Sequence, residues 1–175
     1  MKYFTPQLWE AFNSPRREVA FKIYDRRLVS YKKQLVELLP RLGPKARRFF
    51  REVCLLHDGT LARLEVGDSI EDPHRGLGRD KINERRVSVS AFILSENGES
   101  LYTLQYTGVA RVDLNCPGKV TLFPVGKHAH FGDWGYDELT ATKGGLFRHE
   151  VLFASGSTFV VEFKKFSFHK RQIGS

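Results

Sequence analysis

The sequence predicts an α+β fold in which N-terminal helices, including a long amphipathic helix in a hairpin, precede a mostly antiparallel β-sheet or partly open barrel. Between residues 15 and 39, apolar side chains recur at alternating spacings of three and four, the period of a helix with one buried stripe. After residue 59 the period changes to two, and glycine-containing turns separate the apolar runs. We therefore expect a helical hairpin region at 1–55 and an antiparallel β domain at 56–175.

The long helix has two chemically different faces. Its apolar stripe consists of Phe21, Tyr24, Leu28, Tyr31, Leu35 and Leu38. Lys22, Arg26 and Lys33 fall on the opposite face by the 3.6-residue period, where they meet water or an acidic ligand. Other apolar residues fall off the stripe and imply a second cover, either the short first helix or another subunit: Val19, Ile23, Val29 and Val36.

Two shorter helices flank the long one. Thr5-Pro6 places a capping residue before a proline, so we expect a helix from Pro6 to Phe12. A proline-containing turn then ends the long helix, and 45–55 has the pattern of a third helix that runs antiparallel to it. The apolar side of this third helix carries Phe49 and Phe50. Its basic side carries Arg47, Arg48 and Arg51.

Alternating apolar residues predict strands at 62–66, 87–93, 101–109 (continuing into 112–114), 120–125, 134–142, 146–153 and 158–168. Asn97-Gly98 has the composition of a type I′ hairpin turn. Phe166 and Phe168 fall off the face that the preceding apolar residues share, which implies a bulge or a second contact in the last strand. The segment 68–84 lacks periodicity, and a loop of this length is usually functional or disordered.

Length and composition are those of a single folded domain. The two cysteines, Cys54 and Cys116, are too few for a disulfide framework and suit reduced thiols in a cytosol. The chain has no run of 18 apolar residues and no apolar leader at its start, so we expect a soluble, cytoplasmic protein that does not enter a membrane. The sequence leaves the oligomeric state open.

The net charge of +8 is concentrated in the helical part of the chain. Residues 1–52 contain 13 Lys or Arg against 5 Asp or Glu, whereas residues 53–175 contain 15 of each. Such asymmetry indicates either a solvated helix surface or a binding surface for nucleic acid, anionic lipid or an acidic protein. As a binding surface, the basic side chains that would contact an acidic partner or phosphates are Lys22, Arg26, Lys33, Arg47, Arg48 and Arg51.

Short motifs along most of the chain resemble those of a family of small bacterial cytosolic proteins, a domain of unknown function. They are Met1-Lys2-Tyr3-Phe4-Thr5-Pro6 with Leu8-Trp9, Leu56-His57-Asp58, Asp133-Trp134 with Tyr136-Asp137-Glu138, and His149-Glu150-Val151 followed by Ser155-Gly156. The resemblance implies a bacterial cytosolic protein and carries no established activity. Some members of such families look like immunity proteins or accessory components of defence loci, although the basic N-terminal helices depart from the acidic helices expected there.

No catalytic motif stands out. The sequence contains no Gly-x-Ser-x-Gly, P-loop or dinucleotide fingerprint. His128 and His130 alternate, and with Asp133 they are weak candidates for a metal site, because zinc normally takes three or four protein ligands. His57-Asp58 resembles the pair of metal phosphohydrolases but precedes a strand, where shaping a turn is the simpler role. We therefore predict no cofactor and assign no catalytic residue.

These observations leave two functional hypotheses. The first is a non-enzymatic protein-interaction module, because a clear core pattern is combined with the absence of a convergent catalytic set. Its candidate contact aromatics are Tyr102, Tyr106, Trp134 and Tyr136, for which burial in the sheet is the alternative. The second is nucleic-acid or anionic-polymer binding through the basic N-terminal helices. Metal-assisted hydrolysis at His128 and His130 is a third and weaker reading.

Overall fold

The computed structural model describes residues 1–12, 14–15, 17–52, 55–69, 86–116 and 131–173, and it confirms the α+β class. The helical elements are α1 (Pro6–Phe12), α2 (Arg17–Leu38), the 3-10 helix η1 (Leu39–Arg41) and α3 (Pro44–Arg51). The strands are β1 (Thr60–Ser69), β2 (Arg86–Leu94), β3 (Ser100–Thr107), β4 (Arg111–Asn115), β5 (Trp134–Ala141), β6 (Phe147–Phe153), β7 (Thr158–Phe163) and β8 (Lys165–Gln172). The predicted strand 120–125 and most of the segment 68–84 lie outside the described residues.

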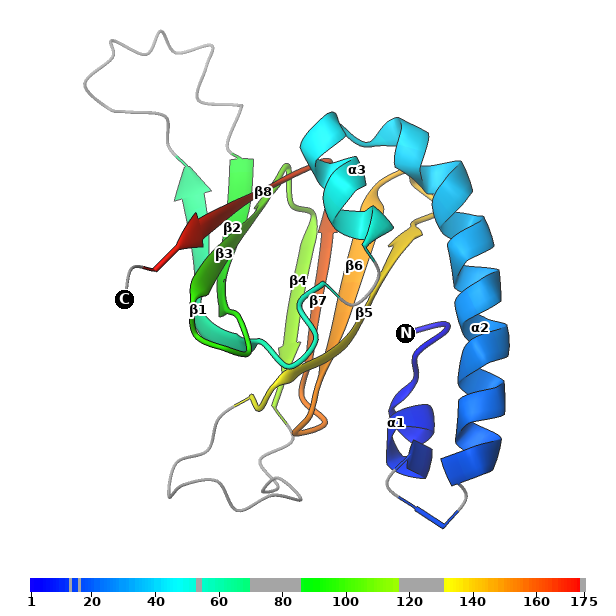
Figure 1. The fold of residues 1–175 in the computed structure, drawn as a ribbon. Helices are drawn as coiled ribbons and strands as arrows, with labels where there is room; N and C mark the ends of the chain where they lie inside the picture. Colours follow the sequence, from blue (N-terminus) through cyan, green and yellow to red (C-terminus); the bar gives the residue numbers. More distant parts are fainter. Residues whose placement is uncertain (13, 16, 53–54, 70–85, 117–130, 174–175) are drawn as a thin grey trace, which may run out of the picture.

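The strands form two antiparallel four-stranded sheets, with orders β1-β2-β3-β8 and β4-β7-β6-β5, and these do not close into a barrel (Figure 1). At one corner both β3 to β4 and β7 to β8 pass from one sheet to the other. There the Lys164 amide donates to the Thr107 carbonyl (3.1 Å) and the Ala110 amide donates to the Glu162 carbonyl (2.9 Å). Among the described residues, an isolated β-bridge between Thr60 and Asp133 also links the sheets.

The segment 158–168, predicted as one strand, is two strands separated by Lys164. Phe159 and Phe163 point into the core from one sheet, and Phe166 points into the same core from the other sheet. The change of face that the sequence displays after Phe163 therefore marks a corner at which the chain changes sheets. The sequence pattern located this break but did not identify its cause.

The hairpin between β2 and β3 also differs from the prediction. Gly98 has a positive φ of 72°, whereas Asn97 does not, although a type I′ turn needs positive φ at both central residues. The Ser95 amide donates to the Ser100 carbonyl (2.8 Å), which leaves a four-residue loop. The turn is correctly placed by the sequence but is longer than a type I′ hairpin.

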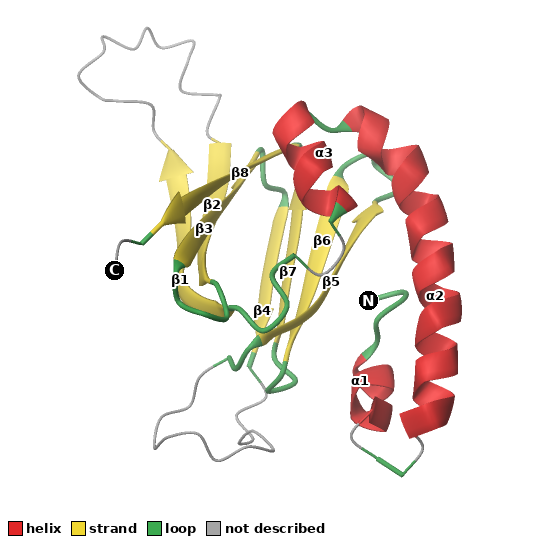
Figure 2. Cartoon of the chain, viewed as in Figure 1, coloured by secondary structure: helices red, strands yellow, loops and turns green. Residues whose placement is uncertain are grey.

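The helix α2 lies beside α1 and along β5, whereas α3 lies over β8 at one end of the molecule (Figures 1 and 2). The structure thus places α1, rather than α3, next to the long helix. Because β5 is the last strand of its sheet, its free edge needs partners. Tyr31 Oη accepts from the Leu139 amide (2.8 Å) and Gln34 Nε2 donates to the Leu139 carbonyl (3.2 Å), so α2 supplies both partners of Leu139 at this edge.

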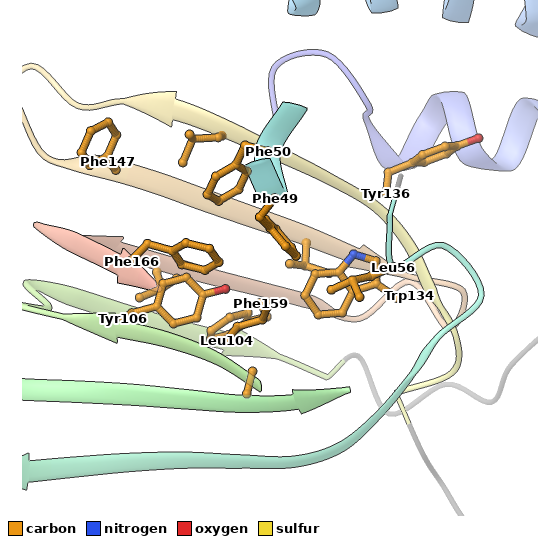
Figure 3. Packing of buried hydrophobic residues seen from close by; sticks show 14 of the residues in the cluster. Phe49, Phe50, Leu56, Leu104, Tyr106, Trp134, Tyr136, Phe147, Phe159 and Phe166 are labelled. Carbon is orange, nitrogen blue, oxygen red and sulfur yellow. The ribbon is translucent and has the colours of Figure 1, made fainter. Parts of the chain in front are cut away.

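One hydrophobic cluster joins the helices to both sheets (Figure 3). From the predicted stripe of α2, Tyr31, Leu35 and Leu38 are buried and Tyr24 and Leu28 are partly buried. Phe21 is 45% exposed and packs edge-on against Phe12, with 4.9 Å between ring centroids. The predicted contact aromatics are all buried: Tyr102, Tyr106, Trp134 and Tyr136.

Within the described part of the chain, no helix has both the length and the apolar character needed to cross a membrane.

Candidate functional site

The solvent face of α2 carries an alternating basic and apolar stripe. Its members follow spacings of three and four and are all exposed: Val19, Lys22, Arg26, Val29, Lys33 and Val36. The three valines are 57%, 55% and 69% exposed, respectively, which is unusual for apolar side chains placed in register on one helix face. We refer to these six residues as the outer stripe. It lies opposite the buried face that includes Tyr31 and Leu35.

The cations of the outer stripe are exposed to solvent. No carboxylate of a described residue forms a salt bridge with Lys22, Arg26 or Lys33. The Arg26 side chain donates from Nε to the Lys22 carbonyl (3.3 Å), a contact along the helix surface that keeps its charge. Glu18 and Glu37 are exposed near the two ends of the stripe and exposed Asp25 borders its middle, where Lys22, Arg26 and Lys33 leave an excess of positive charge.

The predicted basic residues of α3 belong to a different part of the molecule. Arg48 and Arg51 are exposed, and Arg48 Nε lies 3.9 Å from Glu52 Oε1. Arg47 is half-buried, and its Nε has no hydrogen-bond partner among the described residues. Since α2 flanks β5 and α3 covers β8, the six predicted cations divide into two separate groups (Figure 1).

The metal candidates His128 and His130 lie outside the described residues, and Asp133 is exposed and forms the β-bridge with Thr60. The described ranges contain no group of three potential metal ligands. His57 Nδ1 lies 2.9 Å from Asp58 Oδ2, and Asp58 has a φ of 62°. This pair sits at the turn that leads into β1.

A chain of hydrogen bonds crosses the core between the two sheets. Tyr106 Oη lies 2.8 Å from His149 Nδ1, and His149 Nε2 lies 3.1 Å from Asp137 Oδ2. Trp134 Nε1 donates to Asp137 Oδ1 (3.1 Å). This order of acid, imidazole and hydroxyl resembles a nucleophilic triad, but Tyr106 and His149 are fully buried, and the Phe50 ring covers His149 at 5.1 Å. We assign this chain of hydrogen bonds a structural role that links the two sheets.

Burial, reinforced by the nearby charge of Asp137, raises the pKa of the Tyr106 hydroxyl well above its ordinary value of 10.0. Tyr106 should therefore stay protonated in the folded protein at pH values at which it ionises in the unfolded chain. As the pH rises above the ordinary pKa of tyrosine, the Tyr106 hydroxyl loses its proton in the unfolded state before it does so in the folded state. Deprotonation therefore favours the unfolded state, and the free energy of unfolding declines. We expect Tyr106→Phe to leave the native absorbance titration of the tyrosines unchanged. A smaller titration amplitude in the folded variant would contradict this.

A second polar network fixes the N-terminal segment on the outer face of β5 and β6. The Glu138 carboxylate is fully buried and accepts hydrogen bonds from the amides of Lys2, Tyr3 (2.8 Å) and Phe4 (3.2 Å). The Met1 ammonium lies 3.1 Å from Glu150 Oε1. Asp137 and Glu138, adjacent in sequence, thus serve opposite faces of the sheet, as strand geometry requires.

Arg148 connects this network to β7 through two charged hydrogen bonds, each 2.8 Å long, to Glu150 and Glu162. The hydrogen bond to Glu150 raises the pKa of Arg148. Burial acts to raise the pKa of Glu150, but the hydrogen bonds from Arg148 and from the Met1 ammonium outweigh it and hold that pKa below its ordinary value. Sequence reasoning missed this network, because its members are far apart in the chain.

The lowered pKa of Glu150 predicts acid-dependent stability. The ionised Glu150 side chain contributes to stability at pH values above the ordinary pKa of a carboxyl group. This contribution is lost as the pH falls through the lowered pKa of Glu150 in the folded state. We expect Glu150→Gln to reduce the free energy of unfolding by about 1–3 kcal/mol at neutral pH. The difference from the parent protein should shrink in urea titrations below about pH 4. Glu65→Gln, on an exposed position of β1, is the control. A pH-independent difference would exclude this role.

Comparisons of the chain with protein-family models, with curated proteins and with solved structures give no match.

Proposed function

We propose that this chain is a non-enzymatic protein-interaction module whose outer stripe on α2 binds an acidic amphipathic helix of a partner protein. The observation that carries the proposal is the register of exposed valines and of cations that form no salt bridge with a described carboxylate along one face of α2. The resemblance noted above adds the expectation of a bacterial cytosolic setting and an immunity-like or defence-accessory role.

The spacing of the stripe favours a helical partner. Alternating steps of three and four from Val19 to Val36 follow the seam by which two helices pack along their length. The stripe extends over roughly 26 Å of helix axis, which matches five turns of a partner. Val19, Val29 and Val36 would then contact apolar side chains of that partner, and the intervening cations would pair with its carboxylates.

The positive charge of the outer stripe argues against a second copy of this chain as the binding partner. In an antiparallel pair of α2 helices centred on the stripe, Lys22 of one copy would face Lys33 of the other, and a parallel pair would place each cation beside its own counterpart. Like charges in these positions oppose association. An acidic helix removes the repulsion and retains the valine contacts.

Binding of nucleic acid remains the second candidate, because the same exposed cations could contact phosphates. The valines distinguish the two candidates. Phosphate contacts depend on charge and salt and gain little from exposed aliphatic side chains. Packing against a partner helix needs these side chains.

The test uses a designed helical peptide with leucines at spacings of three and four, flanked by glutamates, and a matched peptide in which lysines replace the glutamates. Fluorescence anisotropy measures their affinity for the protein. We expect the acidic peptide to bind and the basic one not to bind. Arg26→Glu combined with Lys33→Glu should weaken binding by more than about tenfold. Lys143→Glu combined with Lys164→Glu, at exposed positions elsewhere, is the charge-matched control.

Val29→Ser combined with Val36→Ser tests the apolar contacts and should weaken peptide binding by about tenfold, from lost burial of two valines. Val66→Ser, at a valine that is 60% exposed on β1, is the control. Short DNA or RNA that binds equally well to the valine variant and the parent, with no peptide binding, would favour the nucleic-acid alternative. Failure of the acidic peptide to bind at low salt would overturn the proposal.

A further inference from the structure

A groove of about 460 Å³ lies between α3 and the sheet face formed by β3 and β8. One wall consists of Lys45 and Arg48 on α3, followed by Glu52. Tyr102 on β3 pairs in register with Lys170 on β8, so both side chains project toward α3 from the same face. This groove shares no residue with the outer stripe of α2.

The inner part of the groove is apolar because it borders the edge of the hydrophobic core. Phe168 lines it and contacts the Phe49 ring, with 5.1 Å between centroids. Leu55 and the buried Tyr102 complete this surface. The same two residues also border a neighbouring hollow of about 260 Å³ that contains polar side chains such as Ser95 and Asn97. An apolar group in the groove would therefore contact Leu55 and Phe168 and leave its polar end toward solvent.

The rim of the groove is basic from both sides. No carboxylate of a described residue forms a salt bridge with Lys45 or Lys170, and the Lys170 ammonium lies 5.4 Å from the centre of the Tyr102 ring. Glu52 is the acidic residue of the lining, and its contact with Arg48 at 3.9 Å joins two exposed side chains. Three cations against one carboxylate leave an excess of positive charge around an apolar floor.

We propose that this groove binds a small organic anion whose flat apolar body lies on Leu55 and Phe168 and whose phosphate or carboxylate contacts Lys45 and Lys170. The volume lies within the range of small-molecule sites, which combine apolar walls with a few orienting polar groups. Binding needs both halves of the ligand, because exposed cations alone hold anions weakly in water.

Calorimetric titrations with 1-naphthyl phosphate, 1-naphthoate, inorganic phosphate and 1-naphthol test this requirement. We expect 1-naphthyl phosphate or 1-naphthoate to bind, and the preferred one identifies the anionic group. Inorganic phosphate and 1-naphthol should bind at least about tenfold more weakly than the preferred ligand. Equal binding of inorganic phosphate would overturn the proposal, as would the absence of binding by both naphthyl anions.

Substitutions then locate the site. Lys45→Glu combined with Lys170→Glu should weaken binding of the preferred naphthyl anion by about tenfold or more, because both changes reverse charge at the rim. Lys143→Glu combined with Lys164→Glu should have no effect. Leu55→Ser should weaken binding by about fivefold through lost apolar contact. Circular dichroism and thermal melting verify that each variant folds. If the variant with Lys45→Glu and Lys170→Glu binds the ligand as tightly as the parent, the ligand binds elsewhere and the proposed groove site is wrong. This outcome does not depend on whether α2 binds a peptide.

Discussion

Glu138→Ala is expected to lower the free energy of unfolding by about 3–5 kcal/mol, because it removes a buried charged acceptor and leaves its donors unpaired. The amides of Lys2, Tyr3 and Phe4 all donate to this carboxylate, and Tyr3 and Phe4 are themselves buried. Their segment connects α1 to β5, so its release should also loosen the contact between α1 and the sheet. Urea unfolding measures the loss, and hydrogen exchange at the Tyr3 and Phe4 amides measures the local opening.

Glu138→Gln is the matched variant for this experiment. It retains one carbonyl oxygen as an acceptor and should cost clearly less than the alanine substitution. Glu65→Ala, at an exposed position of β1, should change stability by less than about 0.5 kcal/mol. A Glu138→Ala protein that unfolds at the same urea concentration as the parent would show that the N-terminal segment is not held by this carboxylate.

Phe50→Ala is expected to destabilise the protein by about 3–5 kcal/mol, the usual cost of removing a large buried aromatic side chain. Phe50 is 3% exposed and projects from α3 into the space between the sheets (Figure 3). Its ring lies 4.9 Å from those of Phe49 and Phe166 and 5.1 Å from that of His149. The alanine variant would leave a cavity directly above the buried hydrogen-bond chain.

Phe21→Ala provides the matched control, since Phe21 is also a helical phenylalanine but is 45% exposed. It should cost no more than about 1 kcal/mol. Guanidinium unfolding of the two variants under the same conditions gives the comparison. If both substitutions cost the same, α3 does not contribute to the core in the way described. Phe50→Leu should fall between them, because leucine fills part of the volume.

The sequence predicted elements whose signal lies within a short window. The long helix, its buried residues Tyr31, Leu35 and Leu38, and its opposite basic face all follow from the 3.6-residue period. The antiparallel class follows from the alternation of apolar residues and the short turns between strands. These features depend on backbone geometry that repeats every two to four residues, so neighbouring residues are enough to reveal them.

The candidate binding face was predicted in part. The positions of Lys22, Arg26 and Lys33 opposite the buried stripe were read from periodicity, and the structure places all three in solvent. The valines between them were expected to be covered by the short first helix or by another subunit, and α1 does not cover them. Their exposure depends on where α1 and β5 lie, and the sequence does not state which side of α2 those elements occupy.

The sequence by itself determined the type and approximate place of the elements and the concentration of positive charge in the N-terminal helices. Only the tertiary structure decided the division into two sheets, the corner at Lys164 and the separation of the α2 cations from the α3 cations. The same holds for the hydrogen bonds between the N-terminal segment and Glu138, and for the chain of hydrogen bonds that connects Tyr106 with Trp134. Most of those features join residues that are far apart in the chain: Tyr106 and His149 are separated by 43 positions, and Tyr3 and Glu138 by 135. Contacts over such distances depend on how whole elements pack, which no local spacing of residues encodes.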